Sequence, residues 1–411
     1  MYARKTPSSP TRRSAAPVPS GADQVYVAMS DGVKLATDLY LPHGRRRFPA
    51  IVTRLPYDKC NRENMIEFIA GAATDRGYAV VAQDTRGKFR SEGRFSPFAD
   101  EALDGHDTLE WVTHQSWCSG DVVMYGASYF GFTQWAAAAS AHPALRAVAP
   151  TTTASMIGRD WVWRQGIFEL GRIATWCAIT WMDKELHDWD IELDWNVRPL
   201  ADVIPSTFGG RTSPVLSCLA SLREHDPFWV DAVYGGRNPV FGSSVAGLHS
   251  GGWWDSFSRG QITDWALASR TSSHPHRLIM DAVDHYLGEW SLEAAGLPNF
   301  DAMSISELSD YGTASMQAPL ELFDQVIFGP ANRHPAVSWK LTHEDWRYDE
   351  HGHPRIVAPR RCTFAPGPIP APRTAQRSPP HPPPRASGSH GRTIRMTSCR
   401  RAAWRTDSRI S

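Results

Sequence analysis

The stretch that decides the fold is Val122-Val123-Met124-Tyr125-Gly126-Ala127-Ser128-Tyr129-Phe130-Gly131, where an apolar run leads into a serine flanked by small residues. Residues 122–125 predict a buried strand, and the alanine-rich residues 133–140 predict a helix. Small neighbours allow Ser128 to sit in a tight turn that holds its hydroxyl clear of the backbone, at a helix N-terminus. This strand-turn-helix pattern is typical of a nucleophilic serine.

Such a serine needs a base to accept its proton and an acid to orient that base. In proteins with this kind of turn, the three residues follow the order serine, acid, histidine, each after the end of a strand. Asp255 follows the strand expected over residues 243–248, and His285 follows the strand expected over residues 277–280. We therefore expect Ser128, Asp255 and His285 to form a catalytic triad. Asp255 also suits the N-cap of the next helix.

Strand-like and helix-like segments alternate on both sides of Ser128. The expected strands are 50–53, 79–83, 122–125, 145–149, 243–248 and 277–280, and the expected helices are 65–74, 101–113, 133–140 and 256–269. Residues 25–29 and 34–41 precede them and predict a hairpin around an Asp-Gly turn. Short apolar strands separated by amphipathic helices predict an α/β core with a mostly parallel sheet covered on both faces.

The pattern divides the chain into six regions. We expect a disordered leader over 1–22, the first part of the core over 23–150, a helical cap over 151–240, the second part of the core over 241–315, the start of a further β domain over 316–350, and a disordered tail over 351–411. The cap region is rich in tryptophan and lacks strand patterns. The tail contains 11 Pro and 12 Arg, a composition that cannot bury enough apolar surface to fold.

Charge and composition limit the choice of partners and location. The formal net charge is +0, but residues 1–350 hold 31 basic and 42 acidic groups, so nucleic acid is not an expected partner. Six widely spaced cysteines suggest reduced thiols in the cytoplasm. With no apolar run of membrane-spanning length and no export signal, no membrane partner is expected. A homo-oligomer is left open.

Several further motifs resemble the CocE/NonD hydrolases, a family that includes cocaine esterase, α-amino-acid ester hydrolases and X-prolyl dipeptidyl aminopeptidases. The similar stretches lie between residues 24 and 348 and include Ser30-Asp31-Gly32, Arg54-Leu55-Pro56-Tyr57, Gln83-Asp84-Thr85-Arg86-Gly87, Gln115-Ser116-Trp117, Gly126-Ala127-Ser128-Tyr129 and Gly251-Gly252-Trp253-Trp254-Asp255. The resemblance implies an α/β-hydrolase fold with a helical cap and a C-terminal jelly-roll domain.

The resemblance also implies roles for individual residues. It assigns Ser128 as nucleophile, His285 as general base and Asp255 as the acid, and it implies an oxyanion hole from the Tyr129 backbone N–H and the Tyr57 hydroxyl. Without the resemblance, a tyrosine packed at a strand end would explain Tyr57 equally well.

The expected substrate pocket is aromatic. Phe257 resembles the aromatic residue of the family's acyl pocket, and the cap tryptophans Trp163 and Trp176 are our candidates for contact with substrate. Most cap tryptophans are expected to pack between helices instead.

Together these features predict a serine hydrolase that cleaves ester or amide bonds of small acyl substrates through an acyl-enzyme, without a metal or other cofactor. Release of X-Pro dipeptides from short peptides is the alternative, with the acidic residues of the cap (183–194) as candidates for binding the substrate ammonium. A third alternative is an inactive, truncated remnant, because Asp281-Ala282-Val283 replaces the family's usual turn before the histidine and the jelly-roll pattern stops near His351.

Two other polar groups are expected to be structural. Asp84 and Arg86 suit an ion pair or loop brace. The pairs His274/His276 and His351/His353 have too few neighbouring ligands for a metal site, so we expect them at the surface.

Overall fold

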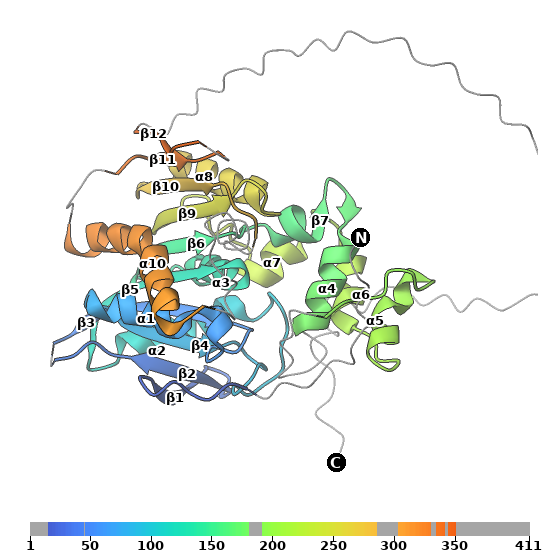
Figure 1. Ribbon diagram of the computed structural model, residues 1–411, viewed down its shortest axis with the longest axis horizontal. Coiled ribbons are helices and arrows are strands. Elements are labelled where there is room, and N and C mark those ends of the chain that lie inside the picture. Colours follow the sequence, from blue (N-terminus) through green and yellow to red (C-terminus); the bar gives the residue numbers. More distant parts are fainter. Residues whose placement is uncertain are drawn as a thin grey trace, which may run out of the picture. The chain divides into compact units, whose positions relative to one another are not determined.

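The computed structural model describes residues 15–44, 46–180, 191–285, 303–329, 334–341 and 344–350. Within them, one sheet of ten strands organises the fold (Figure 1). Its strands are β1 (Asp23–Ala28), β2 (Lys34–Tyr40), β3 (Phe48–Leu55), β4 (Ala79–Asp84), β5 (Cys118–Ala127), β6 (Leu145–Thr151), β9 (Ala246–Gly252), β10 (His276–Asp281), β11 (Val337–Trp339) and β12 (Arg347–Asp349).

The strand order is β1-β2-β4-β3-β5-β6-β9-β10-β11-β12. The pairs β1/β2, β2/β4 and β11/β12 are antiparallel, and the six pairs between β4 and β11 are parallel. The predicted hairpin is therefore present at one edge, and the predicted mostly parallel sheet is confirmed. Parallel strands bring their carboxyl ends to one edge of the sheet, where polar side chains of distant segments can meet.

Helices accompany most of the strands. They are α1 (Ile66–Asp75), α2 (Glu101–Thr113), α3 (Ser128–Ala139), α4 (Leu170–Thr180), α5 (Val203–Thr207), α6 (Pro214–Ser221), α7 (Phe228–Tyr234), α8 (Ser258–Thr271) and α10 (Ile305–Phe328). All residues of β3 and β4 are buried, although side chains alternate between the two faces of a strand. Both faces of the sheet are therefore covered at these central strands, as their apolar pattern predicts.

The cap region between β6 and β9 contains α4 to α7, but it is not free of strands. A short antiparallel pair, β7 (Trp163–Arg164) and β8 (Ile167–Phe168), forms within it. Gln165 and Gly166, which join the two strands, both have positive φ, as a two-residue hairpin turn requires. The strand-free prediction is wrong here because two-residue strands are too short to give a visible alternation.

Strand β9 lies later in the sequence than predicted. We expect it over 243–248, whereas it runs from Ala246 to Gly252. Its last residue has no room for a side chain, because a Cβ on Gly252 would lie 2.1 Å from the carbonyl oxygen of Val283. The two glycines that resemble a loop in the sequence therefore permit close packing at the end of the strand.

The inner part of the expected leader is held by hydrogen bonds. The Ala16 N–H donates to Asp58 Oδ2 at 2.7 Å, and the Arg90 guanidinium donates to the Ala16 carbonyl. Ala16 thus contacts the core although it lies in the expected leader, while residues 1–14 lie outside the described residues.

The segment expected to begin a jelly-roll domain instead extends the central sheet. Val337–Trp339 pairs in parallel with β10, and β12 pairs with it in turn. Helix α10 lies beside α1 in Figure 1 and is joined to it by the close approach of Gly312 to Phe68. Strands β11 and β12 therefore belong to the central sheet. The further β domain expected to begin in residues 316–350 stays a prediction. The expected disordered tail, 351–411, lies outside the described residues, as do His351 and His353.

Candidate active site

Ser128 stands at the junction of β5 and α3, as its sequence context predicts. Its φ of 54° lies in the left-handed region, which is unfavourable for a serine and marks a strained turn. A Cβ on Gly126 would lie 2.5 Å from the Phe130 ring, and one on Gly131 would lie 2.7 Å from the Thr153 methyl group. The two glycines therefore allow the strand and the helix to approach closely enough to form the turn.

A chain of hydrogen bonds joins the three predicted triad residues. His285 Nε2 lies 3.0 Å from Ser128 Oγ, and His285 Nδ1 lies 2.8 Å from Asp255 Oδ1. Because a carboxylate accepts hydrogen bonds and does not donate them, Nδ1 carries the proton and Nε2 is left to accept from the serine hydroxyl. The imidazole thus has the tautomer that a general base for Ser128 requires.

The sheet explains why residues so distant in sequence meet. Ser128 follows β5, Asp255 lies in the turn after β9, and His285 follows β10. Since β5, β6, β9 and β10 are neighbouring parallel strands, all three side chains emerge at the same edge. The Asp255 side chain is fully buried, whereas that of His285 remains 30% exposed. His285 is therefore reachable from solvent, whereas Asp255 is not.

The first turn of α3 offers backbone donors beside the serine. The helix begins at Ser128, and no side chain caps its N-terminus. The first N–H groups of a helix have no partner within the helix and carry partial positive charge. The N–H of Tyr129 is one of them, so it is available to an oxygen bound above Ser128.

Tyr57, the second predicted donor, lies after β3 and is buried. Its ring makes edge contacts with Tyr129 and Phe130, with centroids 6.5 and 6.3 Å apart. Its hydroxyl oxygen accepts a hydrogen bond of 3.0 Å from Trp176 Nε1. Tyr57 and Ser128 line the same cavity.

This cavity is narrow, with a volume of about 10 Å³. It is lined mainly by aromatic and aliphatic side chains, namely Tyr57, Phe98, Tyr129, Phe132, Ile157, Trp161, Trp176 and Phe257, with Ser128 at its wall. No carboxylate is among the lining residues in the part of the chain that is described. The apolar character of this lining favours an apolar group over a charged one beside Ser128.

Two of the three predicted substrate contacts line the cavity, namely Phe257 and Trp176. Trp163 does not. Its ring packs against Phe168, with centroids 5.1 Å apart, and beneath the Arg223 guanidinium at 5.5 Å. Its neighbour Trp161 takes the place in the cavity wall, stacked on Phe257 with the ring planes 13° apart.

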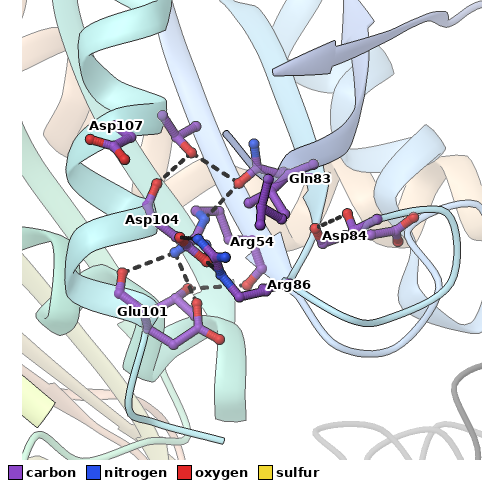
Figure 2. Close-up of polar contacts among 12 residues, drawn as sticks. Arg54, Gln83, Asp84, Arg86, Glu101, Asp104 and Asp107 are labelled. Carbon is purple, nitrogen blue, oxygen red and sulfur yellow. Dashed lines mark hydrogen bonds and ion pairs between the residues drawn. The ribbon is translucent and has the colours of Figure 1, made fainter. Parts of the chain in front are cut away.

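A buried network of charges around Arg54 (Figure 2) is connected to the residue after Ser128 by a hydrogen bond. The Tyr129 hydroxyl donates to Glu101 Oε1 at 2.9 Å, and Arg54 Nη1 lies 2.9 Å from Glu101 Oε2. Arg54 also lies 3.6 Å from Asp104, which binds Arg86 at 2.6 Å. Burial raises the pKa of Glu101 to about 7, although the Arg54 cation opposes the shift. The sequence gives little sign of this network beyond its buried arginine in an apolar strand.

Asp84 and Arg86 do not pair with each other. Asp84 lies 3.3 Å from Lys59, whereas Arg86 binds Asp31 at 2.7 Å and Asp104 at 2.6 Å. Both are structural, as predicted, but in two separate ion-pair groups. Asp281, the unusual residue before His285, accepts a hydrogen bond from the Ala282 N–H at 2.6 Å.

His276 is not a surface residue as the sequence suggests. It is 7% exposed, and its Nδ1 lies 3.1 Å from Nε2 of the fully buried His249. Within the described residues, no group of three or more potential ligands is placed to hold a metal ion. None of the described helices combines the length and apolar character needed to cross a bilayer.

A family model described as X-Pro dipeptidyl-peptidase (S15 family) matches residues 31–287, which contain Ser128, Asp255 and His285. The chain belongs to this family.

One curated relative is similar to this chain over part of its length. Cocaine esterase from Rhodococcus sp. (strain MB1 Bresler) is 42% identical over 168 residues, which is 39% of this chain and 28% of that protein. The chain thus matches less than a third of this curated relative.

Solved structures show the fold. An α-amino acid ester hydrolase has a TM-score of 0.60 at 24% identity, covering 80% of this chain and 58% of that one. A CocE/NonD family hydrolase from Staphylococcus aureus has a TM-score of 0.55 at 18% identity, covering 80% and 55%. The predicted α/β-hydrolase fold and the resemblance to CocE/NonD hydrolases are confirmed.

Proposed function

We propose that the protein is a serine hydrolase that cleaves ester or amide bonds of small apolar acyl groups, with esters preferred. The observation that carries this proposal is the hydrogen-bonded chain from Ser128 through His285 to Asp255, beside an apolar cavity. The proposal rests on this site, because the chain spans only part of the length of the relatives it matches.

In the first half of the reaction, Ser128 Oγ attacks the carbonyl carbon while His285 Nε2 accepts its proton. Asp255 holds the opposite ring nitrogen and stabilises the imidazolium. The carbonyl oxygen becomes negatively charged and accepts hydrogen bonds from the Tyr129 N–H and the Tyr57 hydroxyl. His285 then protonates the leaving group, which leaves the acyl group on Ser128.

In the second half, a water molecule replaces the leaving group. His285 accepts a proton from the water as it attacks the acyl carbon, and the same two donors stabilise the second tetrahedral intermediate. Collapse of this intermediate returns the proton to Ser128 and releases the acid. His285 thus accepts or donates the proton in every proton transfer of the scheme.

The cavity favours an uncharged acyl group over an X-Pro peptide. A substrate ammonium needs an anionic partner, yet no described lining residue carries a carboxylate. Of the acidic residues predicted for that role, Glu192 and Asp194 are exposed and do not line the cavity, while residues 181–190 lie outside the described residues.

An active-site fluorophosphonate probe tests the nucleophile directly. We expect the wild type to be labelled and Ser128→Ala not to be, with ester hydrolysis reduced by about 10⁴-fold or more. Ser140→Ala, at the end of the same helix, is the matched control and should retain both labelling and hydrolysis. p-Nitrophenyl esters of increasing acyl length, assayed beside Gly-Pro-p-nitroanilide, identify the substrate class.

The third prediction from the sequence, an inactive remnant, gives a different result. A remnant would remain unlabelled although circular dichroism shows it to be folded. Labelling that persists in Ser128→Ala would place the nucleophile elsewhere and contradict the proposed role of this residue. Faster cleavage of the dipeptide anilide than of any ester would favour the peptidase alternative.

A further inference from the structure

One hydrogen bond crosses from the cap to the proposed oxyanion hole. Trp176 Nε1, from helix α4 of the cap, donates to Tyr57 Oη at 3.0 Å, and Tyr57 follows strand β3 of the core. Both side chains are more than nine-tenths buried and both line the cavity beside Ser128. The bond thus joins a cap residue to a group that is proposed to touch the reacting oxygen.

We propose that Trp176 is a positioning residue that orients the Tyr57 hydroxyl for hydrogen bonding to the oxyanion, so that the cap contributes to turnover as well as to binding. This inference rests on the proposed hydrolase function. It goes beyond the role of Trp176 as an aromatic wall of the pocket.

The chemistry of the two groups fixes the direction of the bond. An indole N–H only donates, so the Tyr57 oxygen must accept in this contact. The hydroxyl has a single proton, which therefore points away from Trp176 toward whichever acceptor receives it. During the reaction that acceptor is the developing oxyanion. A hydroxyl that accepts one hydrogen bond also becomes a better donor in the next.

The indole is held firmly enough to orient another group. Its ring is stacked on Tyr129, with planes 14° apart, and on Phe98, with planes 21° apart. Trp161 meets it edge to face at a centroid distance of 5.3 Å. At the end of α4, Lys88 Nζ donates to the Thr180 carbonyl at 2.7 Å and fixes the helix to the core. Packing of this kind locks the rotamer of a supporting residue.

The positioning role and the wall role predict different kinetics. Loss of a wall weakens binding of the acyl group in the ground state and transition state alike, which raises KM. Loss of the N–H donor weakens an interaction with charge that develops only in the transition state, which lowers kcat. The positioning effect also requires Tyr57, whereas the wall effect does not.

The test is a double-mutant cycle on p-nitrophenyl ester hydrolysis. Trp176→Phe should lower kcat on the order of tenfold in the wild-type background, and by less than about twofold in Tyr57→Phe. Trp265→Phe is the matched control, because it also loses an indole hydrogen bond, to the His276 carbonyl, but away from the cavity. Its kcat should be unchanged.

A second variant with an isostere of tryptophan distinguishes loss of the N–H donor from a folding defect in Trp176→Phe. Benzothienylalanine at position 176, introduced by codon suppression, keeps the shape of the indole and replaces only the N–H by sulfur. It should show the same fall in kcat.

Equal effects of Trp176→Phe in both backgrounds, or a change confined to KM, would overturn the positioning role while leaving the hydrolase intact. A folded wild type that is neither labelled by fluorophosphonate nor active would instead overturn the proposed function, and the inference with it.

Discussion

Gly131 illustrates at the scale of one residue how tightly the nucleophile turn is built. A Cβ at this position would lie 2.7 and 2.9 Å from the side chain of Thr153 and 3.1 Å from the Gly126 carbonyl oxygen. We expect Gly131→Ala to lower the free energy of unfolding by about 1–3 kcal/mol, since helix α3 and Thr153 must move apart to admit the methyl group. Urea denaturation should show the lower free energy of unfolding. The rate of ester hydrolysis should also fall, because the turn that holds Ser128 is disturbed.

Gly71 provides the matched control for this substitution. It also lies inside a helix, α1, but no atom lies within 4 Å of its hypothetical Cβ. Gly71→Ala should therefore stabilise the protein, by up to about 1 kcal/mol. A Gly131→Ala variant as stable as the wild type would show that the turn is not closely packed.

The sequence identifies the proposed catalytic residues better than their surroundings. Ser128, Asp255 and His285 can be predicted because each has a local motif and the three follow a known order. Trp161 and Trp163 lie in the same short segment with the same residue type, so no local pattern says which faces the cavity. That distinction depends on how the cap folds against the core, and only the structure provides it.

Arg54 shows at the scale of elements how β3, β4 and α2 are joined by one buried cation. It donates to Gln83 on β4 at 2.8 Å and meets Glu101 and Asp104 at the start of α2 (Figure 2). Arg54→Leu leaves these buried carboxylates without that partner. We expect it to lower the free energy of unfolding by about 3–5 kcal/mol, measured by urea denaturation.

The loss of unfolding free energy in Arg54→Leu should increase as the pH rises. Folding raises the pKa of Glu101 to about 7, so the folded protein holds a proton there in the window where the unfolded chain has already released it. Without Arg54 the folded pKa rises further, so the penalty from ionised Glu101 is larger at pH 8 than at pH 6. The double variant Arg54→Leu/Glu101→Gln should lose this extra pH dependence. A single variant equally destabilised at both pH values would contradict the argument.

The histidine pair that joins β9 to β10 predicts acid sensitivity. Burial lowers the pKa of His276 to about 4, with His274 contributing, and lowers that of His249 well below its ordinary value. The unfolded histidines bind protons below about pH 6.5 while the folded ones do not, so stability falls as pH drops from 6.5 toward 4. For His276 the loss is on the order of 3 kcal/mol.

Comparison of wild type and His276→Gln isolates this contribution. The free energy of unfolding, measured in urea at several pH values between 4 and 7.5, should fall less steeply in the variant. Parallel curves would show that His276 takes up its proton equally well in the folded state.

Element boundaries were predictable where apolar patterns are long. Helix α2 has the predicted limits, and most core strands lie within a few residues of theirs. The predicted range 243–248 ends too early for β9, because Gly251 and Gly252 resemble a loop in the sequence. In the structure, the close approach of Val283 requires a residue without a side chain at position 252. The sequence does not reveal the β7–β8 hairpin, because each strand is only two residues long.

At the scale of the whole molecule, Asp324 joins segments 246 residues apart. It accepts hydrogen bonds from Arg76 at 2.6 Å and from the buried Tyr78 hydroxyl at 2.8 Å, so α10 is tied to the segment between α1 and β4. Asp324→Ala leaves the tyrosine hydroxyl buried without this acceptor. It should lower the free energy of unfolding by about 1–3 kcal/mol.

Asp324→Asn separates the hydrogen bond from the charge. The amide oxygen can still accept from Tyr78, and the exposed ion pair with Arg76 contributes little, so the loss should be less than about 1 kcal/mol. Chemical denaturation of both variants tests the difference. Equal losses would assign the effect to the ion pair.

The general architecture follows from the order of elements, but the role of the last described segment does not. The sequence predicts the start of a further β domain over 316–350, whereas Val337–Trp339 and Arg347–Asp349 pair within the central sheet. A three-residue strand carries too little pattern to show which sheet it joins. Its pairing with β10 is a long-range contact that sequence alone does not reveal.

Strands β6 and β9 pair directly, with Ala147 beside Ala246 and Thr151 beside Ser250, although the entire cap separates them along the chain. A foreign cap could therefore be grafted between these two strands without moving the edge that carries Ser128, Asp255 and His285. Under the proposed function, the acyl groups that such a chimaera accepts would depend on the cavity walls that the new cap supplies. To process them quickly, it would also need to present an N–H donor to Tyr57.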